Sequence, residues 1–81
     1  MEEKAEGYKP GTKFLFLVDY FEASSILDDW MEGCYACDLR MRRAKTAKRI
    51  VVEVADVMVA SMIRRYHPMA KVAIVKPGEG K

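Results

Sequence analysis

Two cysteines, Cys34 and Cys37, are the residues whose type and spacing could carry chemistry in this 81-residue chain. On a helix, residues three positions apart lie on the same side, so the two thiols would be neighbours. The thiolate is the nucleophile of thiol–disulfide exchange, and the N-terminal end of a helix favours it. The pair is therefore a candidate redox site, with Cys34 activated only if a new helix begins after Gly33.

Two other interpretations of the cysteines stay open. They can be two small apolar residues on one buried helix face, because apolar residues recur around them at helical spacing. They can also be half of a metal site, but a structural zinc ion takes four ligands. The single histidine, His67, lies thirty residues after Cys37. We therefore predict that the chain binds no metal and no cofactor.

The hydrophobic pattern predicts the elements that position the cysteines. The run KFLFLVDYF (13–21) is typical of an inner strand buried on both faces, and KVAIVK (71–76) of a second strand. Between them, apolar residues recur at helical spacing over 23–41 and again over 47–66. We predict a small β-α-α-β domain of the α/β class, with two strands and two helices or one long kinked helix.

This order of elements has consequences for domain organisation and assembly. Residues 13–81 form the single small domain, and residues 1–12, with a turn at Pro10 and Gly11, are expected to be a flexible lead-in. Two strands make a poor sheet by themselves. We therefore expect either a homodimer or a protein partner that adds strands.

The densest group of positive charge falls between residues 40 and 49. Lys and Arg side chains provide most contacts to phosphates, so this segment is a candidate for binding nucleic acid. The alternative is a solvated helix face whose bases balance acids one helical turn away. The six basic residues are Arg40, Arg42, Arg43, Lys45, Lys48 and Arg49.

Composition bears on the location of the protein. The net charge is only +2, and the sequence has no apolar run long enough to span a bilayer. The start MEEKAEGYKP is acidic and polar, unlike a secretory signal peptide. We expect a cytoplasmic protein that makes no use of a membrane, and in that compartment a close cysteine pair is rarely a structural disulfide.

Four short segments resemble the thioredoxin family. The segment WMEGCYACDLRM (30–41) is similar to the family's Trp-Ala-Glu-Trp-Cys-Gly-Pro-Cys run, and FLVDYFEA (16–23) resembles its inner strand with a buried acid. The family's helix after the cysteines is similar to AKRIVVEVADVM (47–58), and its later strand is similar to VAIVKPGE (72–79). The resemblance implies a truncated thioredoxin-like fold and a thiol–disulfide oxidoreductase. It also implies that Cys34 attacks, Cys37 resolves the mixed disulfide and Asp19 accepts the proton.

One segment resembles another family. EVADVMVASMIRRYHP (53–68) is similar to the second helix of the dynein light chain family, whose apolar spacing ends in a basic pair. This resemblance implies a non-enzymatic, homodimeric protein-interaction module. The sequence thus leaves three functions open: thiol–disulfide exchange, protein interaction, and nucleic-acid binding through residues 40–49.

Overall fold

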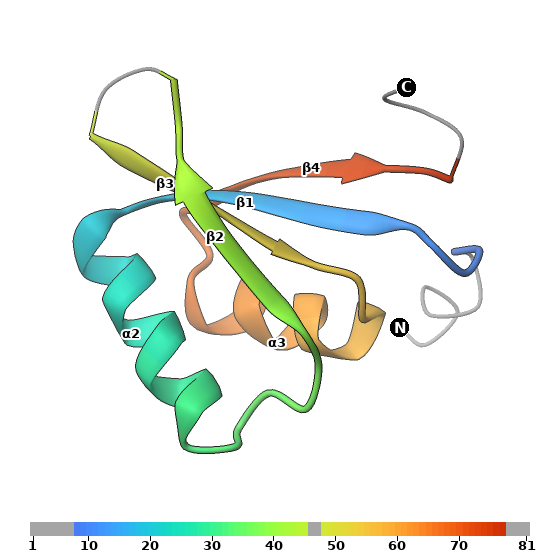
Figure 1. The fold of residues 1–81 in the computed structure, drawn as a ribbon, viewed down its shortest axis with the longest axis horizontal. Coiled ribbons are helices and arrows are strands. Elements are labelled where there is room, and N and C mark those ends of the chain that lie inside the picture. Colours follow the sequence, from blue (N-terminus) through green and yellow to red (C-terminus); the bar gives the residue numbers. More distant parts are fainter. Residues whose placement is uncertain (1–7, 46–47, 78–81) are drawn as a thin grey trace.

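The described part of the chain folds into one antiparallel sheet with two helices. The computed structural model describes residues 8–45 and 48–77. Both helices lie on the same side of the sheet (Figure 1), whose strands follow the order β2-β3-β1-β4. This is the split β-α-β arrangement of ferredoxin-like domains. The elements in chain order are β1 (Lys13–Asp19), α2 (Tyr20–Met31), β2 (Leu39–Arg43), β3 (Arg49–Val54), α3 (Val57–Tyr66) and β4 (Lys71–Val75).

The predicted α/β class is confirmed, but the predicted number of strands is wrong. Residues 39–43 and 49–54 are the strands β2 and β3 and not parts of two helices. Ile50, Val52 and Val54 lie on the helix side of β3, and β-branched residues favour such an extended, half-buried backbone. The sheet therefore reaches an ordinary size within one chain. The reason for expecting added strands disappears, and the homodimer or protein partner stays a prediction.

The hydrophobic core lies between the sheet and the two helices. Side chains alternate along each strand, so every second residue points toward the helices. Phe16 of β1, Ile26 of α2 and Ile63 of α3 are completely buried at the centre. Burying a side chain of this size stabilises the fold by about 1.5–3 kcal/mol. The other buried apolar residues are Phe14, Val18, Ala23, Tyr35, Val52, Val54, Val59 and Ala60.

Neither α2 nor α3 covers the other side of the sheet (Figure 1), which we call the open face. The strand register fixes its composition, pairing Leu15 with Glu53 and Ala73, and Leu17 with Val51 and Lys71. β1 is thus an inner strand as predicted, but it is buried on one face only. The open face consists of Lys13, Leu15, Leu17, Asp19, Arg40, Arg42, Arg49, Val51, Glu53, Lys71, Ala73 and Val75.

Aspartate side chains begin both helices. The Glu22 amide donates to Asp19 Oδ1 at 2.7 Å, and the amides of Met58 and Val59 donate to Asp56 Oδ1 at 2.9 and 3.0 Å. Each carboxylate satisfies backbone donors that have no partner inside the helix, which stabilises a helix by about 1 kcal/mol. The capping residue of α2, Asp19, is also the last residue of β1, so no loop connects the strand to the helix.

Outside the sheet, the structure bears on the predicted turn before β1 and on the absence of a membrane-spanning segment. The turn at Pro10 and Gly11 is confirmed, and Gly11 has a φ of 94°. The earlier part of the predicted lead-in lies outside the described residues. In the described part of the chain, neither the 12-residue α2 nor the 10-residue α3 is long and apolar enough to cross a membrane.

Candidate functional site

Gly33 ends α2, so both cysteines lie in a loop. The prediction that they lie on a helix is wrong. Gly33 adopts the left-handed conformation, with a φ of 89°. Its amide donates to the Trp30 carbonyl at 3.0 Å, and the Cys34 amide donates to the Asp29 carbonyl at 2.9 Å. These two bonds form a Schellman motif, a common helix ending. The chain then continues through a loop to β2, so Cys34 does not begin a new helix.

The two thiols have different surroundings. Both cysteines are free, Cys34 exposed and Cys37 half-buried. Burial raises the pKa of the Cys37 thiol, and the negative charges of Asp56 and Asp38 raise it further. The indole nitrogen of Trp30 donates to the Cys37 carbonyl at 2.7 Å and so ties the loop to α2. A raised pKa lowers the thiolate fraction at neutral pH, so this environment does not activate Cys37.

Asp19 does not have the buried environment that the thioredoxin resemblance implied. Its side chain is exposed, and its carboxylate caps the N-terminus of α2. The 12 residues of α2 separate Asp19 from the loop that carries Cys34. Because a helix rises about 1.5 Å per residue, this length corresponds to roughly 18 Å. The structure therefore does not bring Asp19 together with the cysteines.

A small group of polar side chains surrounds Cys34. Ligand atoms of Asp29, Glu32 and Cys34 all lie within 4.8 Å of one another at the C-terminal end of α2. Asp29 is half-buried, whereas Glu32 and Cys34 are exposed. A structural zinc site takes four protein ligands, and this group of described residues supplies three. Acidic groups at the surface often gather without binding an ion, so we assign no metal to them.

Tyr35, between the two cysteines, was not singled out from the sequence. Its side chain is only 2% exposed, and its hydroxyl has no hydrogen-bond partner among the described residues. Burial raises the pKa of Tyr35, followed by smaller effects of Asp29, Cys34 and Tyr66. A buried hydroxyl without a partner costs stability. The loop is thus anchored by an aromatic side chain, which the spacing of the cysteines alone did not reveal.

The basic segment forms a hairpin of β2 and β3 and not the helix that the spacing suggested. Arg40 and Arg42 lie on the open face from β2, and Arg49 lies there from β3. Arg43 pairs with Ile50 and belongs to the other side of the sheet. Lys45 and Lys48 are exposed next to the turn. The structure therefore gathers half of the six predicted basic residues on one surface.

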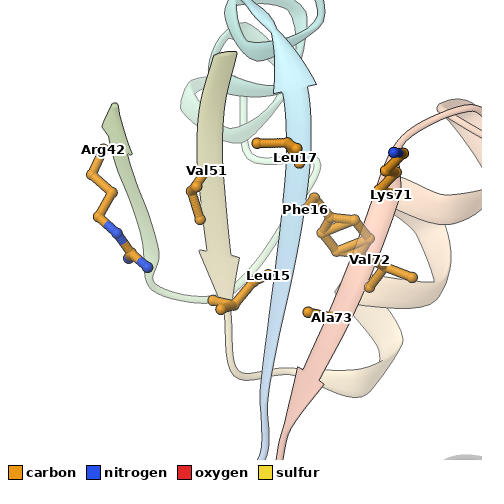
Figure 2. Close-up of a pocket in the computed structure, with 8 residues that line it drawn as sticks. All are labelled: Leu15, Phe16, Leu17, Arg42, Val51, Lys71, Val72 and Ala73. Atoms are coloured by element: carbon orange, nitrogen blue, oxygen red, sulfur yellow. The ribbon is translucent and has the colours of Figure 1, made fainter. Parts of the chain in front are cut away.

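The open face has a shallow apolar hollow at its centre. The side chains of Leu15, Leu17, Val51 and Ala73 line this hollow of about 270 Å³. Figure 2 shows Leu15, Leu17 and Val51 between Arg42 on β2 and Lys71 on β4, with Ala73 further along β4, so a basic residue stands on each outer strand. We call the four apolar side chains the floor. Leu15, Leu17 and Val51 are half-buried and Ala73 is exposed, so the floor can be covered by a ligand.

Positive charge prevails around the floor. Two acids lie on the open face, and the carboxylate of one, Asp19, caps α2. The other, Glu53, lies 3.5 Å from Lys13 Nζ and 3.3 Å from Arg42 Nη1. Arg40, Arg49 and Lys71 form no ion pair with a described acid. The five basic residues of the open face are Lys13, Arg40, Arg42, Arg49 and Lys71.

Comparison with protein-family models, curated proteins and solved structures gives no significant match to this chain. The resemblances to thioredoxins and to dynein light chains therefore stay predictions. The ferredoxin-like topology defines a class of fold but no activity, because one fold can support many unrelated functions.

Proposed function

We propose that this domain binds single-stranded nucleic acid on the open face of its sheet. The single observation that carries the proposal is the floor of four apolar side chains with Arg42 and Lys71 on opposite sides. Bases of an unpaired strand can cover the floor, while its phosphates contact the surrounding Arg and Lys side chains. No catalytic step is part of this function.

The apolar floor favours a single strand over a duplex. In a duplex the bases are stacked inside, and a flat sheet cannot reach their faces. A single strand can spread its bases over a sheet, as RNA-binding sheets do with aromatic side chains. Among the described residues, the open face has aliphatic residues such as Leu15 and Leu17 at its centre and none that is aromatic. We therefore expect modest affinity that depends strongly on salt.

Two exposed aromatic side chains begin α2, directly after the end of β1. Tyr20 and Phe21 follow directly after Asp19, which pairs with Arg49 next to the turn of the basic hairpin. Phe21 is 87% exposed, an unusual position for a large apolar side chain. Aromatic side chains stack on bases regardless of sequence. A strand that runs from the floor toward the hairpin could thus stack a base on Phe21.

The nucleic-acid proposal fits a cytoplasmic location, where unpaired RNA is abundant, and we propose that location with it. The two free thiols agree with a reducing compartment.

The proposal is tested by fluorescence anisotropy with labelled oligouridine, oligothymidine and a duplex of equal length. Each phosphate contact to a single strand contributes about −0.7 to the slope of log affinity against log salt. We expect Arg42→Gln to weaken binding about three- to tenfold. The slope of log affinity against log salt should become less steep by about 0.7. The matched control is Lys9→Gln, which removes the same charge from an exposed residue outside the open face.

A second variant separates the floor from the charges. Leu17→Gln changes a half-buried floor residue and leaves the net charge intact. We expect it to weaken binding without changing the salt slope, because bases and not phosphates lose their contact. Circular dichroism of each variant establishes that the fold is retained. Unchanged affinity in both Arg42→Gln and Leu17→Gln would overturn the site, and equal affinity for the duplex would overturn its preference for single strands.

A further inference from the structure

A second surface, distinct from the open face, lies along the outer edge of β4. Among the described strands, β4 is the last in the sheet order and pairs only with β1. An edge strand presents backbone N–H and C=O groups to which another extended chain can pair. Val72, Ala73, Ile74 and Val75 of this strand are apolar, so its interior offers no charge against pairing.

The opposite edge of the sheet is different. β2 has the sequence LRMRR, and charged side chains on an edge strand hinder pairing with other chains. The two edges of the sheet therefore differ in the charge that they present to an incoming strand. Only the β4 edge combines a short strand with an apolar interior, which makes it the edge open to strand addition.

A polar pocket lies next to the β4 edge on the side of the helices. The pocket has a volume of about 420 Å³ and is lined by Ser61, Arg64 and Arg65 of α3 together with Ala70 and Val72. Arg64 and Arg65 are exposed and form no ion pair with any acid of the described residues. Two unpaired guanidinium groups beside an apolar wall suit a carboxylate carried on an extended chain.

A histidine at the same pocket is already engaged. His67 Nδ1 lies 3.6 Å from Glu22 Oε2, and the His67 side chain is 11% exposed. This contact ties the C-terminal end of α3 to the first turn of α2. His67 is thus held by α2 from outside the pocket, while Arg64 and Arg65 stay available to a ligand.

We propose that an acidic, extended peptide of another protein binds along β4 as an added strand. Its backbone pairs with the free edge of β4, and its acidic side chains contact Arg64 and Arg65. Because side chains of a strand alternate between its two faces, every second residue of the peptide points to the helix side. The acids are therefore expected at alternate positions. Strand addition with pockets for alternate side chains is an established mode of peptide recognition.

The charges argue against a second copy of this chain as the occupant. If two β4 strands paired about a two-fold axis, the pocket of each chain would lie beside that of its partner. Arg64 and Arg65 of both chains would then gather on one side of the joint sheet, where like charges repel. An acidic peptide instead neutralises these side chains, so charge complementarity selects the peptide.

The test measures the affinity of the full chain for labelled peptides by fluorescence anisotropy. The probe alternates Glu and Val, and the comparison peptides alternate Lys and Val or place the same Glu and Val residues in two blocks. We expect the alternating acidic probe to bind at least tenfold more tightly than either. The double variant Arg64→Gln and Arg65→Gln should weaken binding about tenfold, and Lys9→Gln serves as the exposed-charge control.

Peptides methylated on alternate backbone nitrogens test strand addition without changing the protein. Methylating every second nitrogen removes the donors on one edge of the peptide only. Methylation of one set of alternate nitrogens should therefore abolish binding, and methylation of the other set should preserve it. Chemical shifts of the β4 amides report the location of the peptide. The proposal would be overturned by an equal loss of affinity for both methylated peptides or by displacement of the probe by oligouridine. A concentration-dependent dimer that excludes the probe would also overturn it.

Discussion

Arg42 on β2 and Glu53 on β3 form an ion pair on the open face, with Nη1 and Oε1 3.3 Å apart. Glu53 also lies 3.5 Å from Lys13 Nζ, so one carboxylate faces two of the basic side chains proposed to contact phosphates. The side chain of Glu53 is only 16% exposed, whereas those of Lys13 and Arg42 are more than half exposed. Glu53 thus opposes the positive field of the open face and orients the side chains of Lys13 and Arg42.

Neutralising this acid should strengthen the binding of nucleic acid. Glu53→Gln releases Lys13 and Arg42 from the ion pairs, and an exposed pair of this kind is worth about 0.2–1 kcal/mol. We expect affinity for oligouridine to rise about two- to fivefold at low salt, with the gain shrinking as salt increases. Asp28→Asn is the matched control, because Asp28 is an exposed acid at the far end of α2. An equal gain from both variants would indicate net charge alone and not the site.

The ending of α2 depends on the backbone of Gly33. Its φ of 89° is a conformation that side chains with a Cβ rarely adopt, although nothing lies within 4 Å of a Cβ built there. Gly33→Ala should therefore lower the free energy of unfolding by about 1–2 kcal/mol through backbone strain alone. Asn tolerates this conformation better, so Gly33→Asn should cost less. Urea unfolding monitored by circular dichroism gives the ranking, and equal stability of all three proteins would contradict it.

The sequence was informative where hydrophobic residues form an unbroken run. KFLFLVDYF (13–21) and KVAIVK (71–76) predicted β1 and β4 nearly to the residue, because each run is short and bounded by turn residues. The sequence did not predict β2, because LRMRR has only two apolar residues. So short an alternation does not outweigh the helical spacing of the apolar residues before it. β3 failed because its apolar residues fit both periods. Only pairing with β1 and β2 distinguishes the two, and that pairing is not local.

The candidate site was predictable in its residue types but not in its arrangement. The basic residues of 40–49 were identified as a contact for phosphates, yet a helix would have distributed them differently. Leu15 and Leu17 were expected to be buried, because residues 14–18 are apolar without interruption. Their exposure follows from both helices covering the same side of the sheet, which is a property of topology. No local pattern of residues therefore predicted an open face with an apolar floor.

The two thiols should differ in reactivity. Cys34 is exposed, whereas Cys37 is half-buried and has a raised pKa caused mainly by burial. In iodoacetamide labelling near neutral pH, the variant Cys37→Ala should label faster than Cys34→Ala, because only the first retains the accessible thiol. Mass spectrometry of the intact chain follows both rates. Rapid labelling that requires both cysteines, or a midpoint well below that of a free thiol, would instead favour the thiol–disulfide function.

Removing the hydroxyl of Tyr35 should not destabilise the fold. The hydroxyl is buried without a hydrogen-bond partner among the described residues, so the folded protein bears its desolvation cost. Replacing Tyr35 by Phe keeps the aromatic ring and removes this cost, which is about 1–3 kcal/mol for a buried group without a partner. We expect the midpoint of thermal unfolding to rise or stay level. Tyr20→Phe, at a side chain 46% exposed, is the control, and a clear loss of stability in Tyr35→Phe alone would reveal a buried water.

Stability should decline at alkaline pH through the titration of Cys37. Its pKa is raised in the folded state, mainly by burial, so the folded protein holds this proton more tightly than the unfolded chain does. The resulting stabilisation is complete below the pKa of the unfolded thiol and is lost as the pH rises through the folded pKa. The free energy of unfolding in urea, measured under reducing conditions from neutral pH upward, should therefore fall above about pH 8.5.

Two substitutions isolate the contribution of Cys37 to this decline. Cys37→Ala and Cys37→Val both remove the titrating thiol, but they leave different volumes beside the core. Their stabilities at neutral pH should differ, whereas the decline just above the thiol pKa should be shallower than in the wild type for both. Tyr35 also has a raised pKa, from an ordinary value of 10.0, so its contribution begins at higher pH. An unchanged decline in both variants would assign the alkaline loss of stability to Tyr35 or to the lysines and not to Cys37.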